Sequence, residues 1–258
     1  MRSIFFILFL LFMISCEKDP FISCSCDGSK IGLLCREYHY YDGEYRNYID
    51  YEYSNSEYPI IKSYYDIDGS FKKYLLFEYN NKWQLVSEYK FNNKEELLKS
   101  KHILYNENDS IEKISITENQ SLTTTTCFFY NQSNYLISKA HYQNNIQTGY
   151  TIFHYDVNNQ LWKKSRYHAD SLLIGFTLFD TFSNDINKET YYNAQSNITG
   201  FKVKLYENGK ISRINHYDAN NNLITYTSFF YNINGVERIS NYHANGELIS
   251  FINYQYFL

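Results

Sequence analysis

Residues 223–231, Leu-Ile-Thr-Tyr-Thr-Ser-Phe-Phe-Tyr, have the clearest secondary-structure pattern in the sequence. Its residues are β-branched and aromatic, and they follow a period of two rather than the three-and-four spacing of a helix. Odd and even positions are both partly apolar, which is typical of a strand that is partly covered on both faces. The stretch therefore predicts a β-strand, and similar stretches recur along the chain.

The recurrence has a fixed period of about 25 residues. Counting back from Tyr242 in steps of 25 reaches other tyrosines in the same local context, and a doubled step of 51 residues reaches Phe91. These anchor residues are Tyr217, Tyr192, Tyr167 and Tyr142. A second series lies between them, at Tyr79, Tyr105, Tyr130, Tyr155, Phe182, Tyr206, Tyr231 and Tyr254. A period of this kind indicates one small two-element unit copied along the chain.

Turn residues follow most anchors and give the expected connections. Asn-Gly and Asp-Gly pairs such as Asp68-Gly69, Asn208-Gly209 and Asn245-Gly246 favour positive φ, as tight hairpin turns require. Strands joined so closely can pair only with their sequence neighbours in antiparallel fashion. We therefore expect an all-β fold, an antiparallel meander of about sixteen strands built from 25-residue two-strand repeats. Such a sheet is coiled into a spiral or curled into a barrel, and the sequence leaves both open.

The pattern is weakest near residue 117. Thr117 stands where an anchor aromatic is expected, and the run 123–126 consists of threonines. We expect a bulge, an irregular connection or a decayed repeat at this place.

The amino terminus predicts export. Residues 1–15 hold Arg2 and an apolar run too short to span a bilayer, and are interpreted as a lipoprotein signal peptide. Met13-Ile14-Ser15-Cys16 resembles the lipobox of bacterial lipoproteins, which implies lipidation of Cys16 and a membrane anchor. Residues 16–38 are expected to form a tether. The predicted location is the cell envelope, as an outer membrane lipoprotein that is surface-exposed or periplasmic.

The tether contains a cysteine cluster, Cys24, Cys26 and Cys35. Outside the cytoplasm a disulfide from Cys35 to Cys24 or Cys26 is favoured. A metal site is the competing interpretation, but His39 is the only nearby candidate for a fourth ligand, so we predict no metal. Cys127 stands alone in the sequence and is expected to be a small core residue.

Charge and sequence motifs exclude several classes of function. Without residues 1–15 the chain has 23 basic and 28 acidic residues, a net charge of −5, and its lysines and arginines are scattered, so we expect no nucleic-acid partner. No nucleophile elbow, phosphate-binding glycine loop or zinc motif occurs, so no catalytic residue and no cofactor are predicted. Asp66-x-Asp68-Gly69 resembles the start of a calcium loop but lacks the glutamate that follows in one, and is interpreted as turn chemistry.

Two further patterns are weaker signals. His141 and His216, like His168 and His243, are separated by 75 residues, and would stack if three repeats made one turn of a superhelix. Asp109-Ser110-Ile111 and Asp170-Ser171-Leu172 resemble the short sites at which some bacteria attach O-glycans.

The repeats themselves resemble a known family. The segments Tyr-Asp-Ala-Asn-Asn-Asn-Leu at 217–223 and Tyr-His-Ala-Asn-Gly-Glu-Leu at 242–248 resemble the YD repeats of RHS-type proteins, and Tyr-Glu-Asn-Gly-Lys-Ile at 206–211 resembles the related MORN-variant repeats of antitoxin-like proteins. The likeness covers residues 39–258 and implies a β-hairpin shell or spiral. It implies no catalytic residue.

These observations predict a lipid-anchored, noncatalytic repeat protein of the cell envelope that acts as a binding or structural scaffold for a protein or glycan. One alternative is an immunity or antitoxin-like protein that neutralises a toxin. Another is an enzyme acting on envelope polysaccharide, which would need two carboxylates from distant repeats to converge.

Overall fold

The computed structural model describes residues 32–54, 57–119, 121–183 and 185–257. Short tight turns separate period-two stretches along all of these ranges, and each stretch forms a strand. The strands are β1 (Leu34–Tyr41), β2 (Glu44–Tyr53), β3 (Pro59–Asp66), β4 (Phe71–Tyr79), β5 (Leu85–Asn92), β6 (Leu97–Tyr105), β7 (Ile111–Glu118), β8 (Leu122–Tyr130), β9 (Leu136–Gln143), β10 (Ile146–Tyr155), β11 (Leu161–His168), β12 (Leu173–Ser183), β13 (Ile186–Asn193), β14 (Ile198–Glu207), β15 (Lys210–Asp218), β16 (Leu223–Asn232), β17 (Gly235–His243) and β18 (Leu248–Tyr256).

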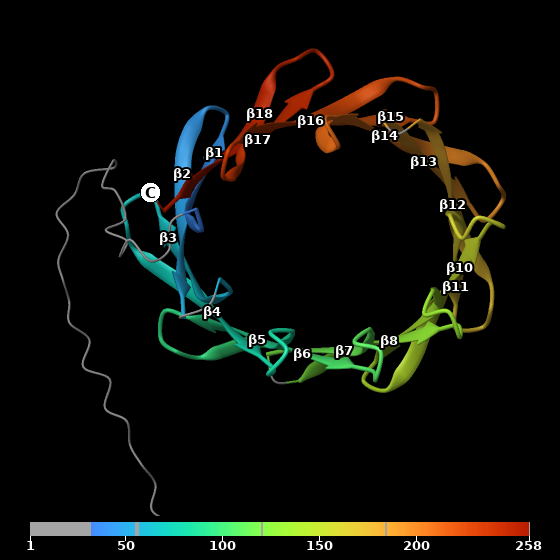
Figure 1. Ribbon diagram of the computed structural model, residues 1–258, viewed down its shortest axis with the longest axis horizontal. Coiled ribbons are helices and arrows are strands. Elements are labelled where there is room, and N and C mark those ends of the chain that lie inside the picture. The colour runs from blue at the N-terminus through green and yellow to red at the C-terminus, as the bar shows by residue number, and fades with distance from the viewer. Residues whose placement is uncertain (1–31, 55–56, 120, 184, 258) are drawn as a thin grey trace, which may run out of the picture.

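The sheet closes on itself. Every strand pairs antiparallel with its sequence neighbours, and β1 pairs with both β2 and β18, so the 18 strands form one ring (Figure 1). The prediction of an antiparallel meander is confirmed, and of the two expected forms the closed barrel is the one observed. The ring has 18 strands rather than about sixteen. Its first strand begins at Leu34, inside the segment 16–38 that the sequence assigns to the tether.

The two faces of the ring differ in how far apart their side chains lie. At equivalent places Leu104 is 55% exposed and Phe129 is 47% exposed, while their sequence neighbours Ile103 and Phe128 are buried and half-buried. A convex surface spreads neighbouring side chains apart and a concave one gathers them. The face that carries Leu104 and Phe129 is therefore the outer face, and the face that carries Ile103 and Phe128 is the inner face.

No filled hydrophobic core holds the ring together. Among the described residues the buried hydrophobic side chains are Cys35, Ile49, Ile103, Ala140 and Phe257. Barrels of 16–18 strands enclose more room than their side chains fill. Most inner side chains are accordingly half-buried, and water reaches both faces of a single-layer sheet.

Aromatic residues take over the role of a core on the outer face. Anchor rings lie face to face with aromatic rings of the adjacent strand, with centroids 4.7 Å apart for Tyr226 and the anchor Tyr242 and 4.6 Å apart for Phe201 and the anchor Tyr217. Equivalent stacked pairs are Tyr40–Phe251, Tyr48–Tyr65, Tyr74–Phe91, Tyr150–Tyr167 and Phe176–Tyr192. The ladder of 25-residue anchors is thus a ladder of stacked pairs, which bury large area without a thick interior.

The second series of tyrosines fastens one rim from the inner face. The hydroxyl of Tyr130 donates to the carbonyl of Ile111, at 2.8 Å, where the preceding strand begins. The same bond, at 2.8–3.0 Å, is made by Tyr53, Tyr79, Tyr105, Tyr155, Tyr231 and Tyr256. Seven odd strands, β1, β3, β5, β7, β9, β15 and β17, are thereby tied to the even strand that follows each of them, and in the last pair the bond comes from Tyr256 rather than from Tyr254.

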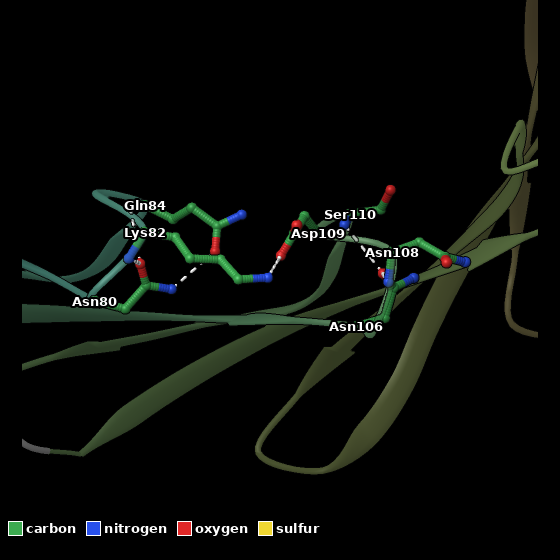
Figure 2. Close-up of polar contacts among 7 residues, drawn as sticks. All are labelled: Asn80, Lys82, Gln84, Asn106, Asn108, Asp109 and Ser110. Atoms are coloured by element: carbon green, nitrogen blue, oxygen red, sulfur yellow. Dashed lines mark hydrogen bonds and ion pairs between the residues drawn. The ribbon is translucent and has the colours of Figure 1, made fainter.

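Seven turns share one hydrogen-bonded design. The Oδ1 atom of Asp218 accepts from the backbone N–H groups of Asn220 and Asn222, at 2.9 and 2.8 Å, and Asn221 has a φ of 68°. Asn80, Asn92, Asn106, Asn131, Asp156 and Asn193 cap their turns in the same way. Figure 2 shows the turns of Asn80 and Asn106, which the ammonium of Lys82 joins by binding Asp109 at 2.6 Å. These are Asx turns, in which the first residue selects the shape.

The expected irregularity near Thr117 is absent from the described residues. Thr117 pairs directly with Thr123, and the β7–β8 ladder shows no register shift, whereas its neighbours each contain a bulge. The hydroxyl groups of Thr117 and Thr123 lie 3.1 Å apart, and those of Ser115 and Thr125 lie 3.4 Å apart. Cross-strand hydroxyl pairs replace the stacked rings here, so the missing aromatic changes the packing and leaves the register intact.

Candidate functional site

Lysines and phenylalanines alternate across the inner face of β8 to β12. The ammonium of Lys139 on β9 lies 5.0 Å from the ring centroid of Phe128 and 5.5 Å from that of Phe153. On β11, Lys164 stands opposite Phe153 in the register and its ammonium lies 5.8 Å from the ring centroid of Phe179. We call these five residues the lysine–phenylalanine row. All five side chains are half-buried, and each ammonium rests beside aromatic rings.

Positive charge is in excess around this row. Within the described part of the chain, neither Lys139 nor Lys164 forms an ion pair. Burial lowers the pKa of Lys139, and the nearby charge of Lys164 lowers it further. The carboxylate that follows on β13, Glu189, is already bound at 2.9 Å by Lys202 and again at 2.9 Å by Lys204. The inner face of β8 to β14 therefore attracts anions.

A second polar cluster lies on the inner face where the ring closes. Glu37 of β1 is 8% exposed, accepts a hydrogen bond from the hydroxyl of Tyr51, and lies 3.1 Å from His39 Nε2 and 3.7 Å from Lys62 Nζ. Burial opposes the charge of Glu37, but the hydrogen bonds from His39 and Tyr51 outweigh it and lower the pKa of the carboxyl group. Burial, with the nearby Glu37 charge, raises the pKa of Tyr51. The cluster joins β1, β2 and β3 beside the seam with β18.

The outer face carries cations at a repeated position, four residues before the anchor. Arg36 forms a bidentate pair with Asp50 and lies 4.3 Å from the ring centroid of Tyr48. Burial opposes the charge of Arg36, but its contacts with Asp50 outweigh this and raise the pKa of the guanidinium. Lys113, Lys163, Lys188, Arg213 and Arg238 occupy the same place in their repeats. Near the last of these, a pocket of about 530 Å³ is lined by Phe230, Glu237, Arg238, Tyr242, Asn253 and Tyr254.

The predicted cysteine sites are only partly described. Cys16, Cys24 and Cys26 lie outside the described residues, so lipidation and the choice of disulfide partner stay predictions. Cys35 is buried and disulfide-bonded. Cys127 is a free thiol, half-buried on the outer face, and not the core residue that the sequence suggests. It pairs in register with Lys113 and Ala140. Because the sheet is a single layer, this position is partly exposed to water.

The other sequence candidates are engaged in local structure. His39 contacts Glu37. Asp66 binds Lys72 at 2.6 Å, and Asp68 accepts from the N–H group of Ser70 at 2.8 Å, as turn chemistry predicts. Ser110 bonds Asn134 of the next turn, and Ser171 occupies the left-handed position of its turn with a φ of 68°.

The histidine pairs do not stack. Two strands make one repeat, so the 18 strands hold nine repeats and a separation of three repeats is a third of the ring. His141 contacts Thr126 at 3.2 Å instead, and burial followed by the charge of Lys139 lowers its pKa.

Sequence reasoning missed the lysine–phenylalanine row because its lysines are scattered along the chain. A signal was present: Lys139 and Lys164 each lie three residues before an anchor, which places them at the same height on adjacent odd strands. Reading the repeat position, rather than looking for runs of lysine, would have found them.

The fold defines the class of this protein as a closed antiparallel β-ring built from two-stranded repeats. No protein-family model and no curated protein matches the chain. A porin-like protein from Bacteroides uniformis aligns with 88% of this chain and 98% of its own, at 10% identity and a TM-score of 0.49. A porin-like protein from Bacteroides vulgatus aligns with 87% of this chain and 98% of its own, at 11% identity and a TM-score of 0.35. At these scores neither likeness defines the function of this chain. The described residues contain no helix of the length and apolarity needed to cross a membrane.

Proposed function

We propose that the protein is a noncatalytic binding scaffold of the cell envelope, held to a membrane by a lipid on Cys16 and presenting its ring to a protein or glycan. The observation that carries this proposal is the closed single-layer sheet, which exposes two long surfaces to water and fills neither with a core. Repeat proteins use such extended surfaces for binding.

The polar clusters of the ring support binding more than catalysis. Hydrolysis of a polysaccharide uses two carboxylates that flank the scissile bond. The most buried cluster contains the carboxylate of Glu37 with two bases, His39 and Lys62, and the hydroxyl of Tyr51. All of these groups are engaged with one another, and their position beside the β1–β18 seam suits closure of the ring.

A membrane-spanning pore is the second candidate, because outer-membrane barrels are also closed and have an even number of strands. In such barrels the outward side chains form an apolar band, and lysine or arginine within it is costly. Here the outer face carries Lys163, Lys188 and Arg213 in successive repeats, with Ser165 and Thr190 near mid-strand. These residues favour a ring that lies outside the bilayer.

A Cys16→Ala variant separates the two candidates. A scaffold held only by its lipid should leave the membrane fraction when Cys16 is replaced, while the matched Cys127→Ala variant should stay with the membrane. A Cys16→Ala chain that still requires detergent for extraction would show that the ring itself is inserted, and would overturn the scaffold in favour of the pore.

The binding role is tested by crosslinking intact cells that carry the anchored protein, followed by purification of the ring. Recovery of one defined envelope protein or glycan, lost after acid unfolding of the ring, is the expected result. Recovery of no partner under conditions that retain the anchor would contradict the binding scaffold.

A further inference from the structure

We propose that the lysine–phenylalanine row binds an acidic polysaccharide, one that carries carboxylate or sulfate groups, along the inner face of the ring. This inference rests on the proposed function and names the ligand class of that scaffold. The row consists of Phe128, Lys139, Phe153, Lys164 and Phe179 on five consecutive strands.

The charge of the row favours an anionic partner. Lys139 and Lys164 have no carboxylate partner among the described residues, although the whole chain carries more acidic than basic groups. Some other lysines of the inner face are neutralised, as Lys62 is by Glu37 and Lys202 by Glu189. A carboxylate or sulfate between Lys139 and Lys164 would relieve their mutual repulsion. Concave surfaces lined by one sign of charge also concentrate such ligands.

The shape of the site favours a slender chain. The row lies inside a closed sheet, so a ligand reaches it only through an open end of the ring (Figure 1). A folded protein domain is too wide for a barrel of this strand number, whereas an extended polymer enters. The flat rings of Phe153 and Phe179 offer apolar surface against which the C–H faces of sugar rings pack.

The spacing of the lysines favours a polysaccharide over a single-stranded nucleic acid. Lys139 and Lys164 lie on strands β9 and β11, two strand spacings or about 10 Å apart. Nucleic acids present a phosphate at every residue, about 3.4 Å apart per strand in a duplex, and are held by dense lysine and arginine clusters. Sparse cations suit a polymer in which only some sugars are charged.

The chain provides a matched control one residue away from the site. Lys163 precedes Lys164 and also rests on an aromatic ring, 4.6 Å from the Phe176 centroid, but on the outer face. Lys163→Gln therefore removes the same charge and the same kind of contact from the same strand without touching the row.

The experiment measures binding of purified full-length protein to polygalacturonate and to heparin, by calorimetry, with neutral dextran and single-stranded DNA as comparison polymers. We expect binding to one or both acidic polysaccharides, at least tenfold weaker binding for Lys139→Gln and for Lys164→Gln, and unchanged binding for Lys163→Gln. Circular dichroism of each variant checks that the ring stays folded. A Lys164→Arg variant, which keeps the charge, should retain affinity within about threefold.

Each other outcome overturns the inference. Equal losses for Lys163→Gln and Lys164→Gln would place any binding in general surface charge. Dextran or DNA bound as tightly as the acidic polysaccharides would reject the ligand class. If no acidic polysaccharide binds while crosslinking still recovers a partner from cells, the row has another role and the scaffold stands.

Discussion

The guanidinium of Arg213 lies 3.8 Å from the ring centroid of Tyr226, and the same contact occurs in four successive repeats of the outer face. The distances are 4.6 Å for Lys163 and Phe176, 4.3 Å for Lys188 and Phe201, and 4.0 Å for Arg238 and Phe251. In each case the ring also stacks on an aromatic ring of an adjacent strand. The repeating unit of the outer face is thus a cation on two stacked rings.

Removal of one such cation should cost a small, measurable amount of stability. For Arg213→Met we expect the free energy of unfolding to fall by about 0.5–1 kcal/mol, because the side chain keeps its apolar contact and loses the cation–π interaction. Urea titration measures the change, and a double-mutant cycle with Tyr226→Leu isolates the pair. Arg166→Met, an exposed arginine on the inner face, should change stability by less than about 0.5 kcal/mol. Additive effects of the Arg213 and Tyr226 substitutions would show that the contact is not stabilising.

The tyrosine hydroxyls of the rim should each contribute one ordinary hydrogen bond. Tyr130→Phe removes the bond to the Ile111 carbonyl and leaves the ring in place, so we expect a loss of about 1 kcal/mol. Tyr206 is the natural control, because its hydroxyl accepts only a long 3.4 Å contact from Asn187. Tyr206→Phe should be closer to neutral. Thermal unfolding of the two variants compares them directly, and a larger loss for Tyr206→Phe would contradict the rim model.

Much of the fold follows from the sequence because the repeat is local. Each anchor fixes its own strand, and an Asp or Asn such as Asp218 fixes the turn after it, so strand order and pairing need no long-range information. Closure of the ring is different, because it depends on the pairing of β1 with β18 from opposite ends of the chain. Glu37, which pairs with Tyr254 across this seam, precedes residues 39–258, the part of the sequence in which the repeat is recognised.

The repeat position picks out the two lysines of the candidate site, but the face that they occupy depends on the geometry of the ring. Lys139 and Lys164 are separated by 25 residues in sequence and appear as isolated lysines, and their parity relative to the anchor decides which face they occupy. The bulge opposite Arg166 and Tyr167 adds Ile174 to β12 and leaves the alternation of β11 intact, so parity separates the two faces, but which face is the inner one depends on how the ring curves. Lys163 and Lys164 show how one position separates an outer contact from an inner one.

The left-handed position of the common turn is a source of strain that substitution should relieve. Glu95 has a φ of 63°, a conformation that costs residues with a Cβ about 1 kcal/mol or more. Glu95→Gly should raise the free energy of unfolding by a few tenths to about 1 kcal/mol, since the relief exceeds the added freedom of the unfolded chain. Gly246 occupies the equivalent place with a φ of 89°, so Gly246→Ala should lower stability. Urea titration of both variants tests the pair, and a shift of the same sign in both would reject this account.

Acid should weaken the ring at its seam, through Glu37. The hydrogen bonds from His39 and Tyr51 overcome burial and hold the pKa of Glu37 below its usual value. A carboxyl group with a lowered folded-state pKa contributes stability that is fully present above the unfolded pKa, about 4.3, and is lost as the pH falls through the folded value. Glu37→Gln should therefore reduce stability at pH 7 by about 1–3 kcal/mol and flatten the loss of stability in acid.

The pKa of Glu52 is shifted in the opposite direction from that of Glu37, so Glu52 serves as the control for the seam. Burial, followed by the charge of Asp50, raises the pKa of Glu52, so its ionisation opposes folding as the pH rises. Glu52→Gln should leave the free energy of unfolding at pH 7 unchanged or increased. It should not reduce the steepness with which that free energy falls as the pH drops below the unfolded pKa of a glutamate, a fall that we call the acid limb. Urea titrations at intervals from about pH 3 to pH 7 compare the two variants with the parent protein. An acid limb that Glu37→Gln leaves as steep as in the parent would show that the seam is not where protonation first acts.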